Sequence, residues 1–374
     1  MESLLLNVEE LVFKFSDELG PEKSVFVYNP KTGLKGMVVV DNVARGPAIG
    51  GVRMLPDVTF EEVFRLARAM TLKNAAAEIP HGGGKSGIIA DPKTANRPEL
   101  IRAFAKGIRH LVEYIPGPDM GTDEKCMAII LDEIGRACGL PRELGGIPLD
   151  EIGSTGYGVV ESAEVACEFA GINLSGATVA VEGFGAVGKA AVKFILKKGA
   201  KVVAVSDSKG AIYNQNGFDY ERLLRTKLET GAVKNYGEGQ ILAPEQIFEL
   251  PVDILIPGAR PDVISERNVH NIKCKLVVEA ANIPATREAE KILHERGILV
   301  VPDFIANAGG VITAAVEYRG GTEKEAFEHI RDKVRRNTKL VLEKADEEGV
   351  MPRVAAEKIA KERVLNAMKY RGRL

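Results

Sequence analysis

The stretch that decides the fold of this chain reads TVAVEGFGAVG at residues 178–188 and KVVAVSD at residues 201–207. A short apolar strand runs into a glycine-rich turn, the turn opens a helix, and a second apolar strand follows. Asp207 ends that second strand, 24 positions after Gly183 (207 − 183 = 24). A Gly-x-Gly-x-x-Gly turn in this context, with an acidic residue at this distance, predicts a dinucleotide-binding unit.

The glycine-rich turn is suited to a pyrophosphate, because glycines let the backbone approach closely and the following helix offers its positive N-terminus. We therefore predict cofactor contacts at Gly183, Gly185, Ala186, Val187 and Gly188. Asp207 would accept hydrogen bonds from the adenosine ribose, and its carboxylate would repel a 2′-phosphate, which favours NAD. The neighbouring Ser208, another predicted contact, and Lys209 keep NADP as an alternative. A glycine-rich turn in another kind of α/β protein is the competing interpretation.

Apolar segments at 253–257, 275–279 and 298–301 are predicted as further strands, with helices between them. Alternation of this kind is typical of a doubly wound parallel sheet in an α/β protein. The carboxyl ends of such strands line the ligand crevice, so Ala259 and Asn282 are predicted cofactor contacts.

The C-terminal part is predicted to be helical. Asn307 is a candidate N-cap, residues 323–348 form a long charged helix, and residues 352–369 form the last helix. A loop-like composition around residues 139–155 marks a domain boundary. We expect an N-terminal α/β substrate and oligomerisation domain at 1–150, rejoined by C-terminal residues from about 350–374, and a Rossmann-type dinucleotide-binding domain at 151–349.

The N-terminal half carries two noteworthy lysines. Lys73 comes near the end of an amphipathic helix, and Lys85 follows three glycines, on a predicted loop before an apolar strand. The resemblance of Gly84-Lys85-Ser86 to a phosphate-binding loop fails on spacing and context, since that loop follows a strand and precedes a helix. A lysine projected from glycines into a cleft loses water and its pKa falls, whereas Lys73 has the plain alternative of a solvated helix-end lysine.

Asp119 lies in the run Ile115 to Glu124, which contains two prolines and two glycines and is predicted to be a rigid loop after a helix at 98–114. A carboxylate held in such a loop suits general acid–base catalysis. The alternative is an N-cap of the next helix, for which Thr122 or Asp123 is better placed.

Composition gives no sign of a nucleic-acid or membrane partner, because the formal net charge is −2 and no apolar run has the length of a membrane span. Four cysteines and five histidines are scattered without metal-ligand spacing, so free buried thiols and no metal are expected. Residues 1–20 mix leucines with acidic residues, which predicts an amphipathic first helix and a cytoplasmic protein.

Taken together, the motifs resemble the glutamate/leucine/phenylalanine/valine dehydrogenase family over most of the chain. The matching stretches are Gly50-Gly51-Val52-Arg53, Lys73-Asn74, Gly82 to Lys85, Pro118-Asp119, Thr155 to Gly158, Gly183 to Gly188, Val205 to Gly210, Ala281-Asn282 and Asn307 to Val311. The resemblance implies reversible oxidative deamination of an L-amino acid to a 2-oxo acid and ammonia, with hydride transfer to a nicotinamide, in a homo-oligomer.

The same resemblance implies a role for individual residues. Lys85 would be the catalytic lysine, Asp119 the proton shuttle and Lys73 the ligand of the substrate α-carboxylate. The substrate would also meet Ile49, Gly50, Gly51 and Ala314, while Thr155, Asp207, Asn282 and Asn307 would join the glycine-rich turn in binding the cofactor. Lys85 would have its pKa lowered by burial and by a cationic neighbour such as Lys73.

Two positions depart from the glutamate-specific branch of the family. That branch has a lysine where this chain has Ile49 and a serine where it has Ala314, and both contact the side-chain carboxylate of glutamate. The apolar pair predicts a pocket for leucine-like or valine-like side chains. The alternatives are a glutamate dehydrogenase with a different carboxylate anchor, a non-catalytic nucleotide-binding relative, and a hydroxy-acid dehydrogenase, which would need a catalytic histidine with an acid partner.

Overall fold

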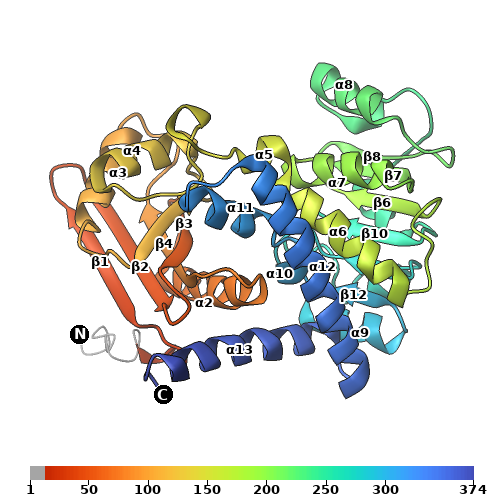
Figure 1. The fold of residues 1–374 in the computed structure, drawn as a ribbon. Coiled ribbons are helices and arrows are strands. Elements are labelled where there is room, and N and C mark those ends of the chain that lie inside the picture. The colour runs from red at the N-terminus through yellow and green to blue at the C-terminus, as the bar shows by residue number, and fades with distance from the viewer. Residues whose placement is uncertain (1–12) are drawn as a thin grey trace, which may run out of the picture. The chain divides into compact units, whose positions relative to one another are not determined.

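The computed structural model describes residues 13–374, which form two compact units (Figure 1). Unit 1 comprises the chain up to Pro148 together with Ala314–Glu323 and Ile359–Leu374, and unit 2 comprises Leu149–Thr313 and Lys324–Lys358. Residues 314–323, which the sequence analysis placed in the dinucleotide-binding domain, thus pack in unit 1. The first helix expected at 1–20 lies largely outside the described residues.

Unit 1 contains a five-stranded mixed sheet in the order β1-β2-β4-β3-β5. The strands are β1 (Lys23–Asn29), β2 (Leu34–Asn42), β3 (Ala48–Leu55), β4 (Gly82–Ile89) and β5 (Tyr114–Pro118). β2 is antiparallel to β1 and β4, whereas β3 runs parallel to β4 and β5. The carboxyl end of β5 therefore lies at the same edge as the carboxyl end of β3.

Helices cover both faces of this sheet, and the alternation of side chains along β2 shows why. Val38 and Val40 pack with α3 (Arg97–Gly107) and α4 (Glu124–Ile134), whereas Met37 and Val39 pack with α2 (Phe60–Ala76). Successive residues of a strand point to opposite faces, so a run of apolar residues fits a strand that is buried on both sides. Thr59 caps α2, since its side chain accepts from the backbone N–H of Glu62.

Three predictions for unit 1 are wrong in detail. The glycines before Lys85 belong to strand β4 and not to a loop, because they let α2 pack directly on it: a Cβ on Gly83 would lie 2.0 Å from the backbone nitrogen of Thr71. The helix expected at 98–114 ends at Gly107, and the prolines and glycines that followed it in the rigid-loop prediction partly form β5. By contrast, the preference for Thr122 or Asp123 over Asp119 as the cap of α4 is confirmed, since Asp123 accepts from the N–H of Cys126.

Unit 2 contains a seven-stranded sheet in the order β12-β11-β10-β6-β7-β8-β9. Its strands are β6 (Thr178–Glu182), β7 (Lys201–Asp207), β8 (Gly210–Tyr213), β9 (Gln240–Leu242), β10 (Ile254–Pro257), β11 (Leu276–Val278) and β12 (Leu299–Val301). The five strands from β12 to β7 are parallel, and β8 and β9 add an antiparallel extension that the sequence did not predict. The strand order reverses between β6 and β10, which is where doubly wound sheets bind ligands.

The helices of unit 2 include the one opened by the glycine-rich turn. The helices are α5 (Leu149–Ile152), α6 (Ser154–Phe169), α7 (Ala186–Lys197), α8 (Tyr220–Thr230), α9 (Arg287–Glu295), α10 (Asp303–Ala306), the start of α11 (Gly309–Tyr318), most of α12 (Glu323–Glu348) and the start of α13 (Pro352–Tyr370). α11 and α13 each begin in unit 2 and end in unit 1. The last part of α13, from Ile359 on, packs in unit 1, where Arg363 donates to the backbone oxygens of Ala75 and Ala76.

The start of α13 carries a buried ion-pair cluster in unit 2. Arg353 lies 2.7 Å from a carboxylate oxygen of Glu279, 2.6 Å from one of Glu290 and 3.0 Å from one of Asp303. One oxygen of Glu279, Oε1, has no hydrogen-bond partner among the described residues. Burial and the neighbouring carboxylates of Glu290 and Asp303 raise the pKa of Glu279 well above its usual value, against the attraction of Arg353.

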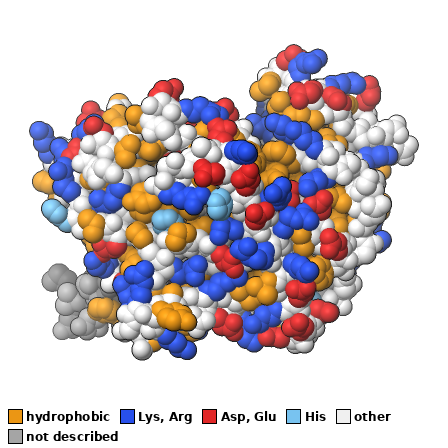
Figure 2. All heavy atoms as spheres, in the orientation of Figure 1, with side chains coloured by type: hydrophobic (Ala, Val, Ile, Leu, Met, Phe, Trp, Pro, Cys, Tyr) orange, Lys and Arg blue, Asp and Glu red, His pale blue; other side chains and the backbone are white. Residues whose placement is uncertain are grey.

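The surface has no dominant sign of charge on the side that Figure 2 shows, where acidic and basic side chains are intermixed. Within residues 13–374, no helix combines the length and the apolar character needed to cross a bilayer. All four cysteines are free and buried, as the sequence predicted, and burial raises the pKa of Cys167 and of Cys274 to about 12.

Candidate functional site

Lys85 and Asp119 come together in unit 1. The ammonium nitrogen of Lys85 lies 2.6 Å from Oδ2 of Asp119, and their side chains are 8% and 18% exposed. Asp119 follows β5 directly, and Lys85 lies in the middle of β4. Nε of Arg53, on β3, donates to the same Oδ2 at 3.1 Å, and Glu62 on α2 accepts a further hydrogen bond from Arg53.

The glycines of β3 allow this close grouping. A Cβ on Gly50 would lie 1.7 Å from the carbonyl oxygen of Gly84, and a Cβ on Gly51 would lie 2.7 Å from the Cβ of Asp119. Residues with side chains at these two positions would push the strands apart or displace the carboxylate. The predicted Gly-Gly motif therefore shapes the lysine–aspartate pair, whatever else it contacts.

Burial and charge act in opposite directions on the pair. Burial lowers the pKa of Lys85 and outweighs Asp119, which raises it, while Arg53 lowers it further. Burial alone would raise the pKa of Asp119, but the two cations Lys85 and Arg53 hold it below its usual value. One carboxylate shared by two cations stays ionised and only partly compensates the lysine, so Lys85 is poised to exchange a proton.

The sequence analysis named Lys73 as an example of a cationic neighbour of Lys85, and in the structure Arg53 is a cation that lowers the pKa of Lys85. Lys73 lies in the last turn of α2, as predicted. The next residue, Asn74, is fully buried and donates to the carbonyl oxygen of Gly82 at 2.6 Å, which fixes the end of α2 on β4.

An apolar cluster lies in the same unit. Ile49, Ile115, Cys138 and Ala314 pack together, each at most 8% exposed. Ile49 pairs with Gly83 across the parallel strands, two residues before Lys85, so Ile49 and Lys85 point to the same face of the sheet. The structure thus brings both predicted specificity positions, Ile49 and Ala314, into one group near the lysine.

The glycine-rich turn of unit 2 fits a dinucleotide. Gly185 is the N-cap of α7, no side chain of the described residues caps this helix end, and a Cβ on Gly185 would meet nothing within 4 Å. A Cβ on Gly188 would lie 1.7 Å from the carbonyl oxygen of Gly183, so the last glycine lets helix and strand pack closely. The helix start, with Ala186 and Val187 in its first turn, is open to a pyrophosphate.

Asp207 ends β7 as predicted, but its carboxylate already has partners. Oδ2 accepts from Nζ of Lys227 at 2.6 Å and from the N–H of Val233 at 2.8 Å, and Oδ1 accepts from the N–H of Lys209 at 2.8 Å. The side chain of Asp207 is 5% exposed. Burial raises its pKa, and these donors more than reverse that effect, so the pKa is lowered. Ser208 beside it is exposed.

The other predicted cofactor residues lie around the end of the same sheet. The N–H of Ala259 donates to Oε2 of Glu182 at 3.0 Å, which ties β10 to β6 at the reversal of strand order. Nδ2 of Asn307 donates to the side-chain oxygen of Asn282 at 3.0 Å. Oγ1 of Thr155 lies 3.0 Å from the position of a Cβ on Gly310, so α6 approaches the start of α11 at a glycine.

The expected N-cap role of Asn307 is wrong. Asn307 ends α10, and its side chain reaches back to the carbonyl oxygens of Ala280 and Ala281 as well as to Asn282. Helix α11 begins at Gly309, so the residue directly before it is Ala308 and not Asn307. Asn307 instead holds in place the loop that carries Asn282.

The sequence analysis missed several residues of the site. Arg53 stood in a quoted motif but received no role, and only the fold shows that it shares Asp119 with Lys85. Ile115 and Cys138 join Ile49 because β5 pairs with β3, a parallel pairing that the sequence did not predict. Lys227 is 20 residues from Asp207 and gives no local signal at all.

A Rossmann-type sheet with an open glycine-rich turn, in one chain with a buried lysine–aspartate pair, defines a nicotinamide-dependent dehydrogenase. The chain belongs to the glutamate/leucine/phenylalanine/valine dehydrogenase family: residues 145–372 match the family's main domain, and residues 21–136 match its dimerisation domain. This confirms the resemblance seen in the sequence. The chain is an amino-acid dehydrogenase, an oxidoreductase that acts on CH–NH2 groups.

Curated relatives are similar over nearly the whole chain. The glutamate dehydrogenase of Aeropyrum pernix is 45% identical over 88% of this chain and 85% of its own length. The NAD-specific glutamate dehydrogenase of Staphylococcus aureus is 39% identical over 88% and 84%, respectively.

Solved structures share the architecture. A hetero-hexameric glutamate dehydrogenase from Thermus thermophilus, in a leucine-bound form, has a TM-score of 0.83 and 31% identity, covering 96% of this chain and 92% of that one. An L-tryptophan dehydrogenase from Nostoc punctiforme has a TM-score of 0.76 and 27% identity, covering 95% and 99%. Proteins with different named substrates therefore share this fold.

Proposed function

We propose that this dehydrogenase oxidatively deaminates L-amino acids with aliphatic side chains, in the manner of leucine or valine. The observation that carries this proposal is the buried apolar cluster of Ile49, Ile115, Cys138 and Ala314 on the face of the sheet that carries Lys85. The products would be a 2-oxo acid and ammonia, and the reaction is reversible. Nicotinamide supplies the acceptor for the hydride that leaves the substrate Cα.

We assign the proton transfers to the buried pair. Lys85, with its pKa lowered by burial, accepts a proton from the water that attacks the iminium carbon and then stabilises the oxygen that gains negative charge. Asp119, ionised and 2.6 Å from Lys85, carries protons to and from the departing amino group. Arg53 holds this carboxylate in position, and Lys73 binds the substrate α-carboxylate.

The cofactor would be held by unit 2, by the residues predicted from the sequence. These are Thr155, Gly183, Gly185, Ala186, Val187, Gly188, Asp207, Ser208, Ala259, Asn282 and Asn307. The open N-terminus of α7 and the close packing at Gly188 support this assignment. The NAD-specific relative supports NAD as a cofactor of this chain, with NADP as the alternative.

Side-chain specificity follows from desolvation. A glutamate side chain placed against Ile49 and Ala314 would lose its water without gaining a cation, and an uncompensated buried carboxylate costs on the order of several kcal/mol. At about 1.4 kcal/mol per factor of ten, this disfavours glutamate by roughly two orders of magnitude in kcat/KM. Thr313 offers no compensation, because its fully buried hydroxyl donates to the carbonyl oxygen of Gly309 at 2.9 Å.

Glutamate is the second candidate substrate, because the relatives at 45% and 39% identity are glutamate dehydrogenases. In that case another basic side chain would hold the side-chain carboxylate. An NADH-forming assay across a panel of L-amino acids, repeated with NADP, separates the two candidates. Leucine or valine should give the highest kcat/KM, and the Lys85→Ala variant should give no turnover with any amino acid.

Oligomer formation is a further part of the proposal. The match of residues 21–136 to a dimerisation domain and the hetero-hexameric neighbour support oligomer formation, and we propose a homo-oligomer. Light scattering coupled to size-exclusion chromatography would give the number of subunits, and a monomer at micromolar concentration would contradict this part.

A further inference from the structure

The carboxylate at the end of β7 is compensated before any cofactor arrives. The side chain of Asp207 is 5% exposed, and the described contacts of its carboxylate are all with donors: the Lys227 ammonium, the N–H of Val233 and the N–H of Lys209. An acidic residue at this position disfavours NADP through its negative charge, which repels the 2′-phosphate unless a cation compensates it. The ion pair with Lys227 compensates the negative charge of Asp207.

Lys227 is held in this position by its own helix end. It lies in the last turn of α8, and its ammonium also donates to the carbonyl oxygen of Gly231 at 3.1 Å. Gly231 ends α8 in the left-handed conformation, with φ of 73°. A cation at a helix C-terminus is favoured by the helix dipole, so the lysine that binds Asp207 is fixed on both sides.

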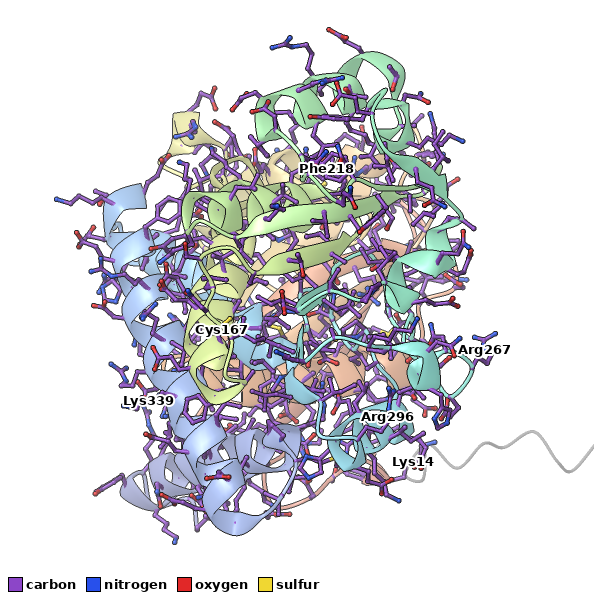
Figure 3. All side chains as sticks on the ribbon, turned by 90° about the vertical axis from the view of Figure 1, so that its right-hand side faces the viewer. Lys14, Cys167, Phe218, Arg267, Arg296 and Lys339 are labelled. Carbon is purple, nitrogen blue, oxygen red and sulfur yellow. The ribbon has the colours of Figure 1, made fainter. Side chains whose placement is uncertain are left out.

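The start of α8 is held by the segment that follows the helix. The ring of Phe218, which is labelled in Figure 3 and precedes the helix, meets the ring of Tyr236 edge-on at 5.0 Å between centroids. The hydroxyl of Tyr236 accepts from the N–H of Asp219, the N-cap of α8. The helix is therefore anchored at its start by these rings and at its end by Asp207.

Two more lysines border the turn that follows β7. A Cβ on Gly231 would lie 2.8 Å from the ammonium of Lys209, so that ammonium lies over the end of α8. A Cβ on Gly210 would lie 2.9 Å from Cδ of Lys234, so the stem of Lys234 runs along the turn. Asp207 with Lys209, Lys227 and Lys234 carries a formal charge of +2, that is, three positive charges and one negative.

We propose that Lys227 is a specificity-determining residue, which neutralises Asp207 and so lets the chain bind NADP as well as NAD. This inference rests on the proposed function of unit 2 as the dinucleotide-binding domain. A 2′-phosphate at the end of β7 meets a compensated carboxylate and two neighbouring lysines, where a lone carboxylate would repel it. The 2′-hydroxyl of NAD gains less from the same lysines.

The test is direct binding of NADH and NADPH, measured by titration of nicotinamide fluorescence without amino acid. The unmodified chain should bind both with dissociation constants within about tenfold of each other, as the absence of one net repulsive charge predicts. Lys227→Met should raise the dissociation constant of NADPH by roughly tenfold or more and that of NADH far less, because it leaves the charge of Asp207 uncompensated. Higher salt should reduce that difference.

A double-mutant cycle identifies the partner. Asp207→Asn alone should strengthen the binding of NADPH, since Lys227 then has no carboxylate to pair with. The double variant Asp207→Asn with Lys227→Met should return the ratio of the NADPH and NADH dissociation constants toward that of the unmodified chain. Arg225→Met is the matched control, because it removes one positive charge from an exposed position of the same helix. Thermal unfolding of each variant checks that it is folded.

An unchanged NADPH/NADH ratio in folded Lys227→Met would overturn the proposal, as would a preference of the unmodified chain for NADH by a factor of roughly a hundred or more. The proposal would also be overturned if Arg225→Met changed the ratio of the two dissociation constants as much as Lys227→Met does, because the effect would then come from the overall charge of the protein. If neither nucleotide binds the unmodified chain, the proposed function of unit 2 itself fails. If both bind and only the ratio is insensitive to Lys227, the proposed function stands and this inference fails.

Discussion

Lys85 and Arg53 both contact the carboxylate of Asp119. Arg53 lowers the pKa of Lys85 and Asp119 raises it, so removing one or the other should shift the pH dependence of activity in opposite directions. The neutral amine of Lys85 is the form that accepts a proton, so activity should rise as the pH rises through its lowered pKa. Arg53→Met removes a cation that lowers this pKa and should move the rise to higher pH. Asp119→Asn removes the carboxylate that raises the pKa and should move it to lower pH.

The pH profile of kcat/KM is the measurement for both variants. Asp119→Asn should also lose on the order of a hundred- to ten-thousand-fold in kcat, as expected for a proton-transfer group. Lys93→Met, an exposed lysine after β4, serves as the charge control. Shifts of the same sign in the two site variants would contradict the shared-carboxylate arrangement.

The apolar cluster gives the prediction on substrate. The double variant Ile49→Lys with Ala314→Ser should raise kcat/KM for glutamate and lower it for leucine, because a buried ammonium and hydroxyl then pair with the side-chain carboxylate. Each single variant should show a smaller change than the double variant. Comparable kcat/KM for glutamate and leucine in the unmodified chain would refute the argument from Ile49 and Ala314.

At the scale of elements, Arg353 at the start of α13 compensates three buried carboxylates. Arg353→Met should destabilise the protein by about 3–5 kcal/mol, the range for breaking a buried ion pair from one side. Arg287→Met is the control, since Arg287 is 80% exposed and its pair with Glu357 should contribute about 0–1 kcal/mol. Chemical denaturation measures both, and equal effects would mean that the buried cluster is not what stabilises the start of α13.

The same cluster makes stability depend on pH through Glu279. Its pKa in the folded chain is raised above 4.5, so the folded state binds more protons than the unfolded state between these two values. The stability contributed by this proton is complete below about pH 4.5 and is lost as the pH rises through the raised pKa. Glu279→Gln keeps the shape without titrating, so denaturation midpoints of the variant should fall less with rising pH.

The sequence predicted elements well where local pattern and local geometry agree. The strand 178–182 and the helix after Gly185 are where the motif placed them, because the turn chemistry and the apolar periodicity point to the same structure. The first part of β4, up to Lys85, is predicted as a loop because its glycines carry no strand signal. Its strand conformation comes from packing against α2, which is tertiary information.

The site divides in the same way. Lys85, Asp119 and Ile49 could be selected from motifs, whereas the partners that set their properties could not. Arg53 reaches Asp119 across 66 positions, and Lys227 reaches Asp207 across 20, because strand order and helix placement bring them together. Such contacts are decided by the whole fold, and a single sequence contains no local pattern for them.

At the scale of the whole molecule, the chain passes between the two units four times, after residues 148, 313, 323 and 358. Neither unit is therefore a continuous segment. A fragment of residues 149–313 lacks α12 and α13 and, with them, Arg353. We expect this fragment to be insoluble or to show no cooperative thermal transition, whereas a two-piece complex cut after residue 148 has lost only one of the four connections.

α13 limits how this protein can evolve by recombination between related genes. When each of two units is one continuous segment, a single crossover between genes can exchange one of them. Here one helix begins in one unit and ends in the other, so its two ends must each suit a different partner surface. A recombinant that takes 149–313 from a relative keeps the host's Arg353 and must also supply carboxylates at the positions of Glu279, Glu290 and Asp303. Exchange of residues 149–313 should therefore succeed only between relatives that have both the arginine and the three carboxylates of this buried ion-pair cluster.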